Sequence, residues 1–72
     1  MKLSYNKLWK MLIDRNMKKY QLRDSAHISS NSVAKLGKGE HVSLDVLMRI
    51  CSTLDCDIGD ICSFVKEGER QE

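Results

Sequence analysis

The segment from Lys18 to Glu40, KKYQLRDSAHISSNSVAKLGKGE, restricts the fold more than any other part of the chain. Its apolar residues recur at helical spacing, which predicts one short helix over about 19–25 and a second over 30–36. Only about three residues join these helices, so they cannot fold back side by side. We therefore expect them to cross steeply, as in a helix-turn-helix.

Within this unit, the apolar residues are expected to face the protein interior. They are Leu22, Ala26, Ile28, Val33 and Leu36. Ser29 is the expected N-cap of the second helix, because a serine hydroxyl can accept a hydrogen bond from a free N–H of the first turn. Gly37 is expected to end this helix, since glycine is common just past a helix C-terminus, and a loop should follow over 37–42.

The rest of the chain also shows helical spacing. A helix is expected from Tyr5 to about Arg15 with Ser4 as its N-cap, another from the cap Ser43 to near Leu54, and a last one after the cap Asp57. The expected apolar face of the last helix consists of Ile58, Ile61, Cys62 and Val65. No segment has the two-residue period of a strand. The predicted fold is therefore all-α, with five short helices.

The chain length of 72 residues fits one domain. We predict a helix-turn-helix domain over 1–66, with the helix-turn-helix itself at about 19–38, and a charged, flexible tail over 67–72. No apolar run approaches the roughly 20 residues of a membrane span, and the N-terminus lacks the apolar core of a signal peptide. A cytoplasmic location is expected.

The three cysteines predict neither a disulfide framework nor a metal site. Their number is odd, and the spacings of Cys51, Cys56 and Cys62 match no usual zinc pattern. Cys51 and Cys62 fall at apolar helical positions, where a reduced cysteine acts as a small hydrophobe. Cys56 is expected in a loop, as the most exposed of the three. No cofactor is indicated.

Charge is divided unevenly along the chain. Residues 1–40 carry nine Lys or Arg against three Asp or Glu, a net +6, whereas residues 41–72 carry three against seven, a net −4. The overall charge of +2 hides this division. A one-sided positive surface is typical of a protein that binds a polyanion.

The predicted helix over 30–36 has the chemistry needed to enter the major groove of DNA. Short polar residues at its start allow its backbone to approach the bases, and an asparagine can pair with the N6/N7 edge of adenine. Lysines nearby can neutralise phosphates. The expected DNA-binding residues are Lys18, Lys19, Ser30, Asn31, Ser32, Lys35 and Lys38.

From Ser4 to Val65 the chain resembles the Cro/C1-type (lambda-repressor-like, XRE) helix-turn-helix transcriptional regulators, especially their short single-domain members. The resemblance implies a five-helix domain that binds operator DNA. It also implies that Lys19 contacts phosphate, that Ser30 and Asn31 read bases, and that Ser32, Lys35 and Lys38 make further contacts.

Two positions depart from the pattern of this family. Arg23 replaces a small residue, often alanine, where the two helices approach closely, and we expect its side chain to swing outward. His27 replaces a turn glycine. If His27 adopts a left-handed conformation, the cost is on the order of 1 kcal/mol.

The sequence bears on two other classes of function. An enzyme is not expected, because the chain lacks a nucleophile motif and its Gly37-Lys38-Gly39 segment lacks the spacing of a phosphate-binding loop. A protein-interaction module of helix-turn-helix shape, antitoxin-like or a co-regulator, is the stronger alternative because the second half is acidic. The family resemblance also suggests a homodimer on a palindromic operator, through the last helix or the tail, with Phe64 and Val65 as contact residues.

Overall fold

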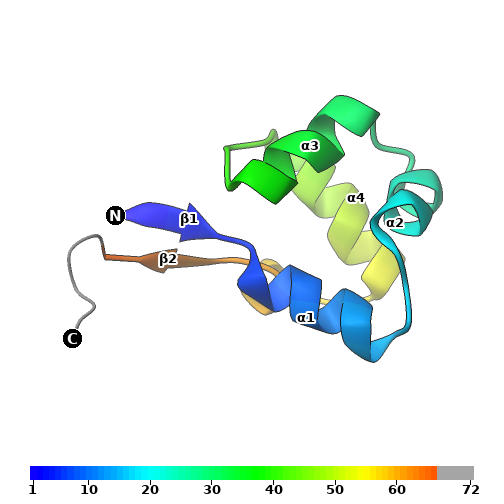
Figure 1. Cartoon of the computed structure of the whole chain (residues 1–72), viewed down its shortest axis with the longest axis horizontal. Coiled ribbons are helices and arrows are strands. Elements are labelled where there is room, and N and C mark those ends of the chain that lie inside the picture. The colour runs from blue at the N-terminus through cyan, green and yellow to red at the C-terminus, as the bar shows by residue number, and fades with distance from the viewer. Residues whose placement is uncertain (67–72) are drawn as a thin grey trace.

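A computed structural model of the chain describes residues 1–66 and is mostly helical, as predicted (Figure 1). Its elements, in order, are β1 (Lys2–Ser4), α1 (Asn6–Asp14), α2 (Lys19–Ala26), α3 (Ser30–Lys38), α4 (Leu44–Leu54), the 3-10 turn η1 (Ile58–Asp60) and β2 (Ser63–Val65). The tail predicted over 67–72 lies outside the described residues. Within those residues, no helix is long and apolar enough to cross a lipid bilayer.

A single apolar core holds the four α-helices together. Its most buried large side chains are Leu8, Leu22, Leu36, Ile50, Leu54 and Ile61. Leu22, Ala26 and Leu36 are buried as predicted, and Val33 is half-buried against the same core. Burial of one such leucine contributes about 1.5–3 kcal/mol, so this core sets the positions of α2 and α3.

The turn between α2 and α3 is held by its own backbone and by α4. His27 adopts the left-handed conformation (φ 57°, ψ 45°) considered from the sequence, and it ends α2. Arg49 of α4 donates a hydrogen bond from Nη1 to the His27 carbonyl at 3.0 Å, and Thr53 donates to the Ser25 carbonyl at 3.5 Å. These contacts tie the helix-turn-helix to the helix behind it.

Two predicted helix caps are confirmed, but the predicted end of α3 is wrong. The hydroxyls of Ser29 and Ser43 accept hydrogen bonds from N–H groups in the first turns of α3 and α4. α3 continues through Gly37 to Lys38, and Gly39 caps it with a φ of 75°. Both glycines permit a helix to end, but only Gly39 takes the left-handed conformation that stops it.

The predicted N-cap of the first helix is wrong by one residue. Tyr5, not Ser4, is the N-cap residue of α1, and Ser4 belongs to β1. The Ser4 hydroxyl nevertheless accepts a hydrogen bond from the Asn6 N–H at 3.3 Å. Ser4 therefore still contributes to the start of α1, from the position just before the N-cap residue.

The predicted fifth α-helix is wrong: the chain makes one 3-10 turn and then a strand. The carboxylate of Asp57 accepts from the Ile58 N–H at 2.8 Å, and that of Asp60 accepts from the Asp57 N–H at 3.0 Å, so the cap is confirmed. After the buried Ile61, β2 pairs antiparallel with β1, with Leu3 opposite Phe64. This ribbon extends away from the helices (Figure 1). Its pairing joins residues from opposite ends of the chain, and three-residue strands are too short for a visible period.

All three cysteines are free thiols and half-buried. Cys56 lies in the loop after α4, as predicted, but packs against the core like the others rather than standing out in solvent. No cluster of three or more His, Cys, Asp or Glu suited to a metal ion occurs within residues 1–66.

Candidate nucleic-acid interface

The first turn of α3 presents its polar side chains outward. Ser30 and Asn31 are the first two residues of the helix, and both are exposed. The opposite side of α3 is anchored by Leu36, which is 1% exposed, and by half-buried Val33. The helix therefore has an apolar side fixed to the domain and a free polar leading end, as a groove-reading helix requires.

Ser32 is placed differently from its two neighbours. Its backbone N–H donates to the Ser29 hydroxyl at 3.1 Å, and the two hydroxyls lie 3.1 Å apart. Ser32 is also half-buried. Its side chain thus shares in the N-cap of α3, which leaves Ser30 and Asn31 as the more accessible polar groups.

Arg23 links α2 to the start of α3, a contact that the sequence pattern did not reveal. Its Nη1 donates a hydrogen bond to the Ser30 hydroxyl at 3.2 Å, and its Nε donates to the Asp24 carboxylate at 3.1 Å. The side chain points outward as expected and is 37% exposed. Because the Ser30 oxygen accepts from Arg23, the Ser30 hydroxyl proton remains available to a second partner.

The four predicted lysines lie at the ends of α2 and α3. Lys18 is the N-cap residue of α2 and Lys19 its first residue, whereas Lys35 and Lys38 lie in the last turn of α3. All four are exposed. Within residues 1–66, none of them forms an ion pair with a carboxylate. Their positive charges are therefore not compensated locally.

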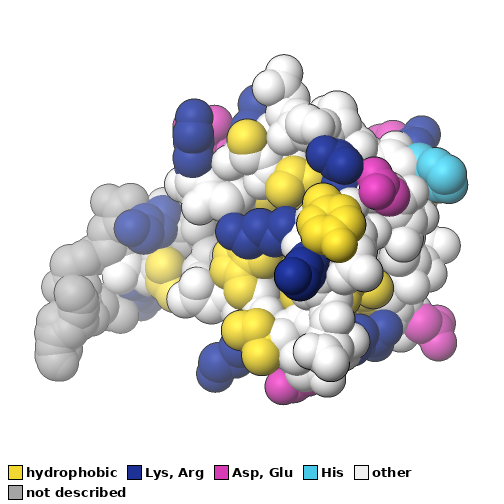
Figure 2. Space-filling model, turned by 45° about the vertical axis from the view of Figure 1, so that its right-hand side comes forward, with side chains coloured by type: hydrophobic (Ala, Val, Ile, Leu, Met, Phe, Trp, Pro, Cys, Tyr) yellow, Lys and Arg dark blue, Asp and Glu magenta, His cyan; other side chains and the backbone are white. Residues whose placement is uncertain are grey.

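The start of α2 is well defined. The Gln21 side-chain oxygen accepts a hydrogen bond from the Lys18 N–H at 2.8 Å, and Lys19 lies over the Trp9 ring with its ammonium 4.4 Å from the ring centroid. The view in Figure 2 turns the α2 side toward the reader and shows Lys and Arg side chains beside hydrophobic ones across this face. The Trp9 ring restricts the position of the Lys19 ammonium.

The loop after α3 is fastened to Tyr5, the N-cap residue of α1. The buried Tyr5 hydroxyl donates a hydrogen bond to the Glu40 carbonyl at 3.0 Å, across 35 positions of sequence. Burial raises the pKa of Tyr5, and the nearby Cys62 adds to this effect. The neutral phenol that donates the bond is therefore favoured, and the end of α3 is held against the body of the domain.

Three aspartates of the second half form hydrogen bonds within the protein. Asp57 and Asp60 cap η1, and Asp45 accepts a hydrogen bond from Arg49 at 2.9 Å. Asp55 ends α4 in the left-handed conformation. The carboxylates of Asp45, Asp57 and Asp60 thus have structural roles on the side formed by α4 and η1.

The helix-turn-helix of α2 and α3 is shared with known proteins. The sequence model of the Cro/C1-type HTH DNA-binding domain matches residues 7–67. The chain belongs to this family. The predicted family and the lambda-repressor-like fold are confirmed, although the expected fifth helix is a single 3-10 turn. The predicted contact residues remain predictions.

A solved structure supports the same assignment. The chain is 56% identical to the transcriptional regulator VanUg in one of its crystal forms, with a TM-score of 0.87. The match covers 92% of this chain and 88% of that one. The comparison with curated proteins gives no match.

Proposed function

We propose that this protein binds specific sequences of double-stranded DNA through the major groove and acts as a small transcriptional regulator of the bacterial or phage type. The observation that carries the proposal is the exposed Ser30–Asn31 pair at the leading end of α3. The family membership and the likeness to a transcriptional regulator support it.

Phosphate contacts are assigned to the ends of α2 and α3. Lys18 and Lys19 lie at the N-terminus of α2, where free N–H groups and the helix dipole also favour an anion. Lys35 and Lys38 lie in the last turn of α3, the proposed recognition helix. Because these cations lie at the start of α2 and at the end of α3, their contacts with the DNA backbone can set the register in which α3 meets the bases.

Base contacts are assigned to Ser30 and Asn31. The Asn31 side chain has no hydrogen bond within residues 1–66, so its amide can offer a donor and an acceptor together to adenine. Ser30 can donate its hydroxyl proton to a base acceptor or a phosphate oxygen while Arg23 holds its oxygen.

A homodimer on a palindromic site is part of the proposal. One recognition helix reads few base pairs, and two helices about 34 Å apart would contact successive major grooves. Phe64 and Val65 remain the proposed contact residues. They lie in β2 rather than in a helix, and Phe64 is 71% exposed instead of packing on the core.

A protein-interaction module is the second candidate, because one surface groove suits an apolar partner. It has a volume of about 240 Å³ and lies between α4 and η1. Its lining includes the exposed side chains of Leu44, Met48 and Ile58. An antitoxin-like or co-regulator role would use this side of the domain and leave α3 free.

Selection of bound fragments from random duplex DNA separates the two candidates. The proposed function predicts enrichment of a short, palindromic sequence, and an affinity whose logarithm falls linearly with log salt by about 0.9 for each phosphate neutralised. Failure to enrich any sequence, with no salt-dependent binding of duplex DNA, would favour the protein-interaction module.

A further inference from the structure

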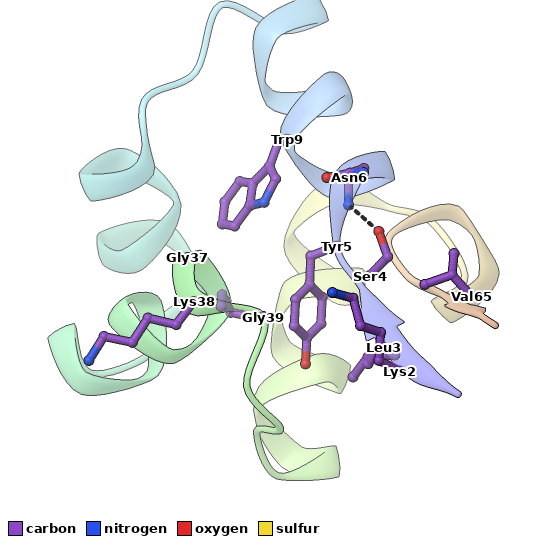
Figure 3. Close-up of a pocket in the computed structure, with 11 residues that line it drawn as sticks. Lys2, Leu3, Ser4, Tyr5, Asn6, Trp9, Gly37, Lys38, Gly39 and Val65 are labelled. Carbon is purple, nitrogen blue, oxygen red and sulfur yellow. Dashed lines mark hydrogen bonds between the residues drawn. The ribbon is translucent and has the colours of Figure 1, made fainter. Parts of the chain in front are cut away.

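A second basic surface lies beside the recognition helix, between β1, the start of α1 and the end of α3 (Figure 3). It is a groove with a volume of about 360 Å³. We name it the β1–α3 groove. Its lining includes Lys2, Asn6, Trp9, Gly37 and Lys38 but no acidic residue.

Cations from separate elements border this groove. Lys2 comes from β1 and lies beside the Tyr5 ring, whereas the side chain of Lys38, at the end of α3, extends away from the groove (Figure 3). Lys19, from α2, reaches the same region over Trp9. Neither Lys2 nor Lys19 pairs with a carboxylate within the part of the chain that the structure describes. The groove is therefore a positively charged concavity.

Gly37 lines the groove beside the Lys19 ammonium. It lies inside α3, where glycine lowers helix stability by about 1 kcal/mol relative to alanine. It has no left-handed conformation to explain its presence. A Cβ at this position would lie 3.9 Å from the Lys19 ammonium, and a longer side chain would extend further into the same space.

Trp9 holds the Lys19 ammonium in place and offers a hydrogen-bond donor to the groove. Its ring is half-buried and holds the Lys19 ammonium by a cation–π contact. Its indole N–H has no hydrogen-bond partner within residues 1–66. An indole nitrogen only donates, so an anion oxygen in the groove is a suitable acceptor.

We propose that the β1–α3 groove binds a phosphodiester group of the DNA backbone, with Lys2 and Lys19 supplying charge and Trp9 lining the site. The inference rests on the proposed DNA-binding function and extends it to β1, which the sequence pattern did not indicate. An elongated polyanion that passes along β1 and the start of α2 is the partner best matched to the cations that these two elements contribute.

Trp9 is the only tryptophan and provides a direct reporter of the site. Its fluorescence is recorded as a random-sequence duplex of about two helical turns is added at low salt. Binding is expected to change the emission. Lys2→Gln should lower the affinity about tenfold at about 50 mM salt, reduce the slope of log affinity against log salt by about 0.9, and diminish the emission change.

Two matched controls separate the groove from general charge and from folding. Lys7→Gln removes the same charge from α1, but the Lys7 ammonium donates to the Gly59 carbonyl at 3.0 Å, so the salt slope should be retained. Gly37→Ala fits beside Lys19 and should leave binding near that of the native protein. Gly37→Glu places a carboxylate in the groove and should weaken binding as much as Lys2→Gln does. Unfolding curves of all variants identify any loss of fold.

Several outcomes would overturn the inference. If Lys2→Gln and Gly37→Glu bind like the native protein while Lys35→Gln binds more weakly, the groove assignment fails and the proposed function stands. If the native protein binds no duplex, both fail. Saturation of the emission change by inorganic phosphate, with no response to duplex, would indicate a site for a free anion instead of the DNA backbone.

Discussion

Arg23 in α2 donates a hydrogen bond to the hydroxyl of Ser30, the first residue of α3, over a distance of 3.2 Å. This contact joins the two helices at the end that we expect to face DNA. It orients Ser30 and places a guanidinium beside it. The departure from a small residue at position 23 thus adds a polar contact without displacing the core, since Leu22 and Ala26 remain buried.

Replacing Arg23 should therefore reduce specificity more than stability. Arg23→Ala is expected to lower the ratio of specific to random-sequence affinity several-fold, because Ser30 loses its orienting partner. The exposed Arg23–Asp24 ion pair should contribute under about 1 kcal/mol to the free energy of unfolding. Arg23→Lys keeps the charge but loses the planar guanidinium. It should therefore keep the salt dependence of the native protein but not its full ratio of specific to random-sequence affinity. Competition binding measures the specific and the random-sequence affinity. An unchanged ratio of the two in Arg23→Ala would contradict the proposed role of Arg23 in orienting Ser30.

His27 is expected to be a strained position. His27→Gly should raise the free energy of unfolding by up to about 1 kcal/mol, because glycine adopts the left-handed conformation without a steric cost. His27→Val should lower it, since a branched side chain fits this conformation poorly. The Arg49 bond to the residue 27 carbonyl remains possible in both variants. Urea unfolding measures the difference, and a lower stability of His27→Gly would count against it.

The Ser29 cap should be measurable in the same way. Ser29→Ala removes the acceptor for the Ser32 N–H and should destabilise the protein by about 1 kcal/mol. Ser52→Ala is a suitable control, because Ser52 is exposed inside α4 and makes no hydrogen bond within residues 1–66. Equal unfolding midpoints for the two variants would show that the cap contributes little.

Alkaline pH should destabilise the fold through its half-buried thiols. Burial, with the nearby Cys56 thiol, raises the pKa of Cys51 from its ordinary 9.0 to about 11. Burial also raises the pKa of Cys62. The unfolded chain then loses these protons at lower pH than the folded protein, so stability is complete below the ordinary pKa and falls as pH rises toward the raised one.

Unfolding midpoints measured from neutral pH to about pH 11 test this expectation. The midpoint should fall with pH, and Cys51→Ala should show a smaller fall even if its stability at neutral pH is also lower. An identical pH dependence in Cys51→Ala and the native protein would exclude Cys51 as a source of the effect.

The parts of the fold that local signals determine were predictable from sequence. The buried face of α2 and the caps Ser29, Ser43 and Asp57 follow from spacing and side-chain chemistry within a few residues. The end of α3 was placed too early because Gly37 and Gly39 carry the same local signal. Only the backbone conformation at Gly39 distinguishes them.

The parts that depend on distant residues were not predictable in this way. β2 replaces the second half of the expected fifth helix because it pairs with β1, from the other end of the chain. The β1–α3 groove likewise combines Lys2, Trp9 and Gly37, which no local motif connects. For the recognition helix, the sequence predicted the exposed Ser30 and Asn31, but not the half-buried position of Ser32 or the Arg23 contact that orients Ser30.

The most direct test of DNA reading by α3 compares the native protein and Asn31→Ala in selection from random duplex DNA. Asn31 is exposed at the start of α3, so its replacement should leave the fold and the salt dependence intact. We expect the sequences selected by Asn31→Ala to lose their preference at one base position in each half-site, and the variant to bind the DNA sequence preferred by the native protein more weakly by about 1–3 kcal/mol. An Asn31→Ala protein that selects the same sequences with the same affinity would contradict the claim that α3 reads DNA through this residue.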